Sequence, residues 1–68
     1  MPSTAISDID YDESRETLTV TFITGRMYEY FDVPLDVAHA FQRASSKGAF
    51  FNRKIRDRYK FREIARIN

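Results

Sequence analysis

The chain of 68 residues contains no cysteine and no tryptophan, and it has only two glycines and one histidine. Without cysteine there can be no disulfide framework, no thiolate zinc site and no cysteine nucleophile, and a reducing compartment is the natural setting. No stretch approaches the roughly 18 consecutive apolar residues of a membrane-spanning helix. The first residues lack the basic segment and the apolar run of a signal peptide. We therefore expect a cytoplasmic protein with no membrane partner.

Residues that could carry catalysis or bind a metal are scarce. His39 has neither a second histidine nor a cysteine to complete a metal site or a triad, so we interpret it as a surface or half-buried structural residue. Asp8, Asp10 and Asp12 resemble the start of a calcium loop, but the glycine and the closing glutamate of such a loop are missing. We expect no enzyme activity, no cofactor, no metal and no small-molecule substrate.

Hydrophobic periodicity predicts one small α+β domain over residues 1–68, with frayed termini. Alternating apolar and polar residues indicate a three-stranded antiparallel meander at about residues 6–11, 17–23 and 27–31. Apolar residues three and four apart indicate two short helices on one face of the sheet, at about residues 35–44 and 47–56, in the order β-β-β-α-α. Residues 61–68 are too short and mixed to indicate an element, although Phe61, Ile64 and Ile67 are spaced for one further turn.

The register of the hairpin around Gly25 decides where two tyrosines point, because a slip by one residue moves every side chain to the other face. A type I turn closed by a bulge at Gly25 requires a positive φ only of glycine, and we favour it. Tyr28 and Tyr30 then lie on the apolar face of the sheet. In the alternative register both tyrosines lie on the open face, as a platform on which bases could stack.

Charge is distributed unevenly along the chain, although the net charge is only +1. Residues 1–37 contain eight acidic residues and two arginines, a net charge of −6, whereas residues 38–68 contain nine basic and two acidic residues, a net charge of +7. A basic half of this kind suits a polyanion or an oppositely charged protein surface, and the plain alternative is a solvated charged face.

The basic segment also offers a place for an anion. Ser46 is a good N-cap for the second helix, and free N–H groups of a first helical turn suit a phosphate. Phe50 and Phe61 are the aromatic residues we expect to be available for contact, as in proteins that bind single-stranded RNA. The candidate nucleic-acid contacts are Ser46, Lys47, Gly48, Arg53, Lys54, Arg56, Arg58 and Lys60.

The order of these residues resembles the KTSC domain, a module of roughly sixty residues named for the C-terminus of some lysyl-tRNA synthetases and also found as stand-alone bacterial proteins. The resemblance runs from Ile9 to Arg66-Ile67 and departs at Asp57, where the family often has glycine. The residues that carry it are Leu18, Val20, Phe22, Gly25, Tyr28-Glu29-Tyr30, Val33-Pro34, Ser46-Lys47-Gly48, Phe51-Asn52, Ile55-Arg56 and Tyr59.

The resemblance implies a bacterial, cytoplasmic domain in a family of unknown function, for which RNA binding has been suggested from the synthetase association. Together with the charge pattern it predicts a non-catalytic module that binds tRNA or single-stranded RNA. The alternative is a module that binds another protein or a second copy of itself. The family-motif residues that we interpret as structural are Tyr28, Tyr30, Phe51, Asn52, Ile55 and Tyr59.

Overall fold

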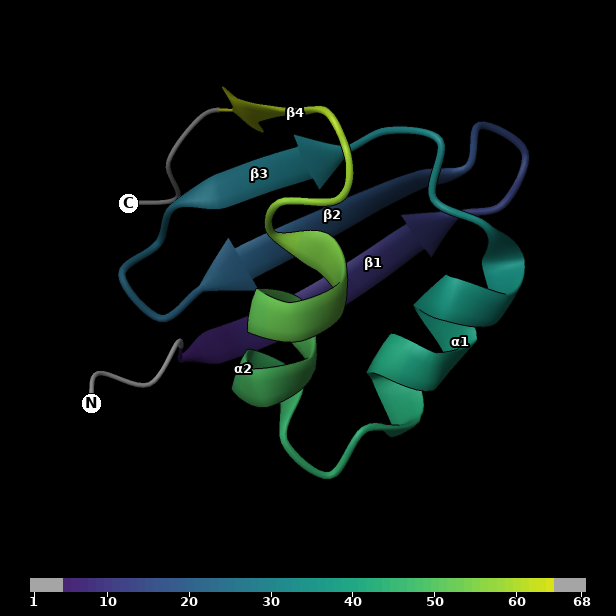
Figure 1. Cartoon of the computed structure of the whole chain (residues 1–68). Coiled ribbons are helices and arrows are strands. Elements are labelled where there is room, and N and C mark those ends of the chain that lie inside the picture. Colours follow the sequence, from purple (N-terminus) through teal and green to yellow (C-terminus); the bar gives the residue numbers. More distant parts are fainter. Residues whose placement is uncertain (1–4, 65–68) are drawn as a thin grey trace.

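A four-stranded antiparallel sheet and a layer of two short helices form the molecule (Figure 1). The structure is a computed structural model and describes residues 5–64. The strands are β1 (Ile6–Asp12), β2 (Thr17–Phe22), β3 (Met27–Tyr30) and β4 (Phe61–Ile64), in the spatial order β1-β2-β3-β4. Between β3 and β4 the chain forms α1 (Leu35–Arg43) and α2 (Lys47–Phe50), which continues as a π-helical segment, η1 (Phe51–Ile55). None of the described helices is long and apolar enough to cross a membrane.

The predicted α+β class is confirmed, but the three-stranded sheet is wrong because β4 adds a fourth strand. Phe61 pairs with Tyr30 and Ile64 with Met27, so β4 lies antiparallel to β3. The one further turn suggested for this tail is also wrong, although Ile67 lies outside the described residues. A four-residue strand carries little alternation of its own. It forms because the free edge of β3 supplies a row of backbone partners.

The hairpin between β2 and β3 has the predicted register. Gly25 has φ of 94°, and its N–H donates to the Phe22 carbonyl at 2.9 Å, which closes the turn. Val20 lies opposite Tyr28, and Leu18 lies opposite Tyr30. Both tyrosines therefore face the helices, and the alternative with both on the open face is wrong.

The first helix follows the predicted pattern. Pro34, with φ of −65°, occupies the N-cap position of α1, where the missing N–H costs nothing. Ala38 and Phe41 are fully buried on the side of α1 that faces the core, while His39 is exposed, as expected for a surface histidine. The apolar stripe thus covers the sheet and leaves the polar residues outside.

The second helix is interrupted in a way that the sequence did not indicate. Ser46 caps α2 as predicted, because its Oγ accepts a hydrogen bond from the Ala49 N–H at 3.2 Å. The Arg56 N–H donates to the Phe51 carbonyl at 2.9 Å, five residues back, so the end of the helix is wound as a π-helix. Phe51 and Ile55 are nevertheless both buried, as the helical spacing predicted.

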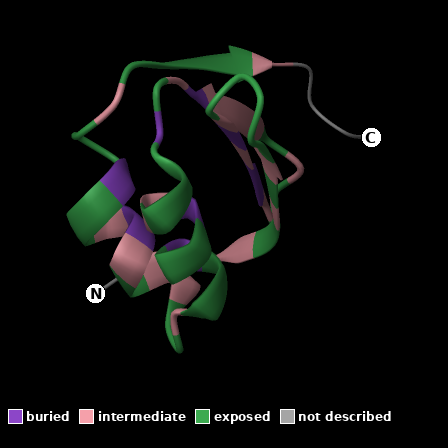
Figure 2. Ribbon diagram, turned by 90° about the vertical axis from the view of Figure 1, so that its right-hand side faces the viewer, coloured by how far each residue is buried: buried purple, intermediate pink, exposed green. Residues whose placement is uncertain are grey.

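The core lies between the sheet and the helices, where the buried residues of both layers face each other (Figure 2). Phe51 is at its centre. Its ring meets those of Phe22 and Tyr30 edge to face, with centroids 5.4 and 5.6 Å apart, and stacks with Phe41 at 6.4 Å. The Tyr11 hydroxyl donates to the Val33 carbonyl at 2.6 Å and ties β1 to the loop before α1. Aromatic contacts therefore join the two layers.

Candidate functional site

At the predicted anion site, at the start of α2, the side chains of Ser46 and Lys47 already have hydrogen-bond partners. The Lys47 ammonium donates to the Ala44 carbonyl at 2.7 Å, at the C-terminal end of α1, and the Ser46 hydroxyl is the helix cap. Lys47 also lines a shallow groove beside Gln42 and the first residues of β1. Ser46, Lys47 and Gly48 therefore serve the connection between the helices, and they lie at the opposite end of the α2–η1 helix from Arg56 and Arg58.

The remaining basic candidates are exposed and lack acidic partners. Within residues 5–64 the ion pairs are Arg15–Asp12, Arg26–Glu63 and Arg62–Glu29, and all three lie in the sheet or its turns. No carboxylate of the described chain lies within ion-pair distance of the basic side chains on η1 and the turn after it. We call these residues the basic surface; they are Arg53, Lys54, Arg56, Arg58 and Lys60.

The basic surface extends around the end of η1. Lys54 and Arg58 line a groove between α1 and η1, together with Tyr59 and Asp36. Arg56 instead lines a larger cavity on the other side of the helix, between η1 and the sheet. Within the basic surface, Arg56 therefore lies on a different side of the helix from Lys54 and Arg58.

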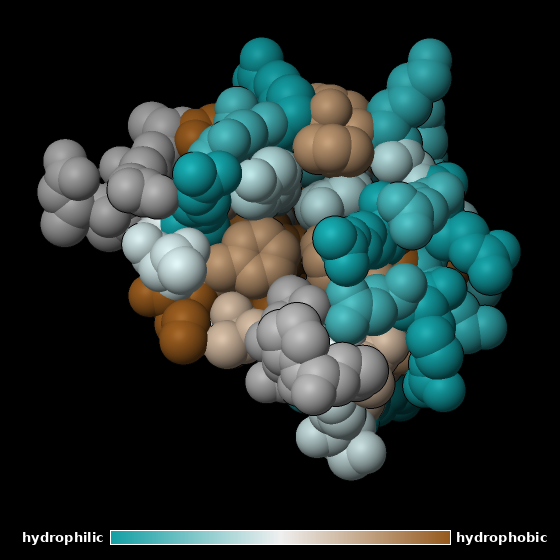
Figure 3. All heavy atoms as spheres, turned by 60° about the vertical axis from the view of Figure 1, so that its left-hand side comes forward, coloured by the Kyte–Doolittle hydropathy of each residue, from teal (hydrophilic) through white to brown (hydrophobic). Residues whose placement is uncertain are grey.

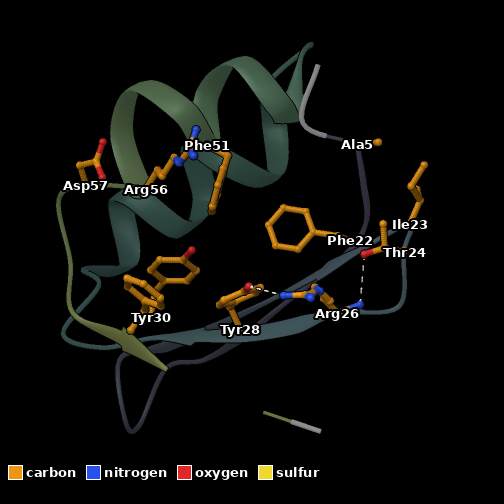
Figure 4. Close-up of a pocket in the computed structure, with 11 residues that line it drawn as sticks. Ala5, Phe22, Ile23, Thr24, Arg26, Tyr28, Tyr30, Phe51, Arg56 and Asp57 are labelled. Atoms are coloured by element: carbon orange, nitrogen blue, oxygen red, sulfur yellow. Dashed lines mark hydrogen bonds between the residues drawn. The ribbon is translucent and has the colours of Figure 1, made fainter. Parts of the chain in front are cut away.

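The larger cavity has walls made largely of aromatic rings and a volume of about 570 Å³. On this side of the molecule, hydrophobic side chains are visible between hydrophilic ones (Figure 3). Phe22, Tyr28 and Tyr30 project from the sheet toward Phe51, which projects from η1 (Figure 4). Phe61 of β4, a residue that is 53% exposed, completes the wall, and its ring stacks with that of Tyr30 at 5.5 Å. We call this space the aromatic cavity.

Polar groups border the aromatic cavity at its rim and in its depth. The Arg26 guanidinium donates to the Tyr28 hydroxyl at 3.5 Å and lies 3.6 Å from the Glu63 carboxylate, and these neighbours raise the pKa of Arg26. Burial raises the pKa of Tyr30 to about 12, with a smaller contribution from Tyr28. The Tyr30 hydroxyl therefore stays protonated at neutral pH. None of the described residues hydrogen-bonds to it, so it can donate to a ligand.

Most of the family-motif residues that we interpret as structural lie in the core or pack against it. Tyr30, Phe51 and Ile55 are buried in the core, and Tyr28 and Tyr59 are half-buried against it. Asn52 is half-buried and has partners of its own within the structure. Asp57, the departure from the family pattern, is exposed in a turn where its φ is negative, so a glycine is not required there.

Sequence reasoning did not find the aromatic cavity. The predicted hairpin register placed Tyr28 and Tyr30 on the correct face of the sheet, and this was the signal in the sequence that pointed toward the cavity. Phe22 and Arg26 come to this space through the β2–β3 hairpin, where the Phe22 N–H donates to the Arg26 carbonyl at 2.9 Å. Phe61 joins them because β4 returns to the sheet beside β3, and the position of η1 leaves room above them.

A metal site is not formed by the described residues, among which no cluster of three or more His, Cys, Asp or Glu side chains could hold an ion. Asp8 and Asp10 are exposed on β1. Asp12 instead accepts hydrogen bonds from the Ser14 hydroxyl and N–H at 2.8 and 3.1 Å, and these, the hydroxyl first, lower its pKa. Of the three carboxylates, that of Asp12 therefore has a structural role in the turn after β1.

Three comparisons with known proteins agree with one another. Residues 2–59 match the sequence profile of the KTSC domain. The structure resembles the crystal structure of a KTSC domain protein from Yersinia pestis, with a TM-score of 0.87, 32% identity, and coverage of 96% of this chain and 92% of that one. An uncharacterised protein of Stutzerimonas stutzeri is 35% identical over 76% of this chain and 73% of its own length.

Larger proteins contain a matching segment. A lysine–tRNA ligase of Nostoc punctiforme is 38% identical over 60 residues, which cover 88% of this chain, and one of Trichormus variabilis is 37% identical over the same share. The chain spans only 11% of the length of these ligases, so the resemblance concerns a small part of them. The fold, the motif residues and the sequence matches lead to one conclusion: the chain belongs to the KTSC domain family.

Proposed function

We propose that this domain is a non-catalytic RNA-binding module whose basic surface contacts backbone phosphates. The observation that carries the proposal is that Arg53, Lys54, Arg56, Arg58 and Lys60 are all exposed and have no carboxylate partner within residues 5–64. A guanidinium or ammonium group without an internal partner keeps its full charge available to a phosphate. Binding through such contacts releases counterions and weakens as salt rises.

The occurrence of a similar segment in lysine–tRNA ligases supports RNA as the polyanion and makes tRNA a reasonable first ligand. Electrostatic contacts to phosphates carry no sequence information by themselves. We therefore expect modest affinity and little sequence preference. Ser46 and Lys47 are left out of the proposed contact surface because their side chains already bond within the domain.

The test compares two double variants that change the net charge equally. Arg53→Gln with Arg58→Gln removes two unpaired cations, whereas Arg15→Gln with Arg62→Gln removes two that have acidic partners. Binding of labelled tRNA and of a short single-stranded RNA is measured by fluorescence anisotropy at about 50 and 200 mM salt. We expect the first variant to lose about tenfold in affinity at low salt. The slope of log K against the logarithm of the salt concentration should become shallower by roughly 0.7 for each lost phosphate contact.

The control variant should bind within about twofold of the unmodified domain, because its arginines lie outside the basic surface and beside carboxylates that partly offset their charge. Equal losses in the two variants would mean that net charge, and not the basic surface, governs binding. Absence of RNA binding by the unmodified domain at low salt would end the proposal.

A protein-binding or self-associating module is the second candidate, and the edges of the sheet favour it. Among residues 5–64, β1 and β4 are edge strands, and Phe61 on β4 is 53% exposed. An open edge beside an exposed aromatic residue can pair with a strand of another chain. Sedimentation without RNA over a series of salt concentrations tests it, since reversible dimerisation would support this candidate.

A further inference from the structure

We propose that the aromatic cavity binds one unstacked nucleobase, with the phosphate of the same nucleotide held by Arg56. The inference rests on the proposed function, because the bound RNA would present that base. The cavity volume of about 570 Å³ lies in the range of sites that enclose small ligands. A flat heterocycle fits an opening whose walls are rings better than a flexible aliphatic chain does.

The rings offer faces that a base can stack on. Phe61 is 53% exposed, and its ring is held in place because it stacks with the buried Tyr30. Tyr28 is half-buried and lies 5.8 Å from the Phe61 ring and 5.6 Å from the Phe22 ring. Aromatic side chains fixed by neighbouring rings lose little freedom when a base stacks on them.

Polar groups around the rings match the edge of a base. The Tyr30 hydroxyl has no hydrogen-bond partner among the described residues, and the Asp57 carboxylate at the rim can accept a bond from an exocyclic amino group. The Tyr28 hydroxyl accepts from Arg26 and still has a hydrogen to donate. Both donors and acceptors are thus present beside the apolar walls.

Of the two arginines that line the aromatic cavity, Arg56 is the one free to hold a phosphate. Arg26 lies 3.6 Å from Glu63 and is partly neutralised, whereas Arg56 has no carboxylate partner in residues 5–64. Arg56 is also one residue from Asp57 and two from Arg58, which belongs to the groove on the other side of the helix. An RNA strand lying across this turn could contact Arg58 through one phosphate and Arg56 through the next.

The test follows the aromatic cavity and the basic surface separately. Side-chain ring signals and backbone amides are followed by NMR while the domain is titrated with adenosine and cytidine monophosphates, with the matching nucleosides, and with a short single-stranded RNA. The variants are Phe61→Ala for the cavity wall and Arg56→Gln for the phosphate. Leu35→Ala, an exposed apolar residue outside the cavity, and Arg15→Gln, an exposed arginine outside both the cavity and the basic surface, are the matched controls.

We expect the nucleotides to shift the ring signals of Phe22, Tyr28 and Phe61. Phe61→Ala should weaken nucleotide and nucleoside binding alike, by about fivefold or more. Arg56→Gln should weaken nucleotide binding several-fold and leave nucleoside binding unchanged, because only the nucleotide carries a phosphate. Leu35→Ala and Arg15→Gln should leave mononucleotide binding within about twofold.

The outcomes separate the two proposals. If RNA shifts the amides of the basic surface while the cavity rings stay unmoved and Phe61→Ala binds normally, the inference is overturned and the RNA-binding proposal stands. If mononucleotides occupy the cavity but RNA does not bind, the site takes free nucleotides and the RNA-binding proposal fails. Equal effects of Arg56→Gln on nucleotide and nucleoside would overturn the role of Arg56.

Discussion

Basic residues of the sheet pair with carboxylates, whereas those at the end of the helical layer do not pair with any carboxylate of the described chain. In the sheet, the Arg62 Nε donates to the Glu29 carboxylate at 2.9 Å, and Arg26 lies 3.6 Å from Glu63. On η1 and the turn after it, Arg53 and its basic neighbours lack such partners within the described chain. The contrast teaches that cations count as binding groups only where the fold has not already neutralised them.

The contrast also corrects the picture given by the linear sequence. Arg62 and Glu63 belong to the basic half of the chain, but β4 carries them into the acidic sheet, where each meets an oppositely charged partner. In the folded domain, unpaired positive charge therefore occupies a smaller region than the net charge of +7 over residues 38–68 suggests. It is concentrated around the end of η1.

The largest expected effect concerns the aromatic contact that joins the two layers. Phe51→Ala should destabilise the domain by about 3–5 kcal/mol, because the ring is 4% exposed and contacts rings from both layers. Urea unfolding followed by circular dichroism measures the loss. Phe51→Leu, which keeps most of the volume, should cost about 1.5 kcal/mol or less and keeps the measurement possible if the alanine variant does not fold.

Phe61→Ala is the matched control, since Phe61 is 53% exposed on an edge strand. Its loss should be about 1 kcal/mol or less. Similar losses for Phe51→Ala and Phe61→Ala would show that the two layers are not joined mainly through Phe51.

The next effect tests the ion pairs directly. A double-mutant cycle with Arg62→Gln and Glu29→Gln should give a coupling of about 0.2–1 kcal/mol that shrinks in high salt, because the Arg62 side chain is 69% exposed. Arg53→Gln should change the free energy of unfolding by no more than about 0.5 kcal/mol. A clear stability loss from Arg53→Gln would reveal a structural role and weaken its assignment to a binding surface.

The smallest effect concerns pH and the turn between β1 and β2. Hydrogen bonds from Ser14 lower the pKa of Asp12, so its contribution to stability is present above the ordinary carboxyl pKa of about 4 and is lost as the pH falls through its lower folded-state value. Asp12→Ala should reduce stability at neutral pH and flatten the decline in acid. Asp10→Ala, on the same exposed strand, is the control, and an equal flattening there would contradict the assignment to Asp12.

Local patterns predicted much of the fold. The turn chemistry at Gly25 set the register that brings Tyr28 and Tyr30 to the helix side, because only glycine adopts a φ of 94° without strain. The spacing of Ala38 with Phe41, and of Phe51 with Ile55, gave the buried sides of the helices. The Ser46 cap followed from residue type alone.

The features that the sequence by itself determined all depend on neighbours along the chain: they are the first three strands, the helical stripes, the hairpin register and the uneven charge. Only the tertiary structure decided that Phe61 to Ile64 form β4, that Arg62 is neutralised by Glu29, and that five aromatic rings surround one cavity. The physical reason is that each of these depends on groups far apart in sequence. The free edge of β3 and the position of η1 above the sheet exist only once the chain has folded.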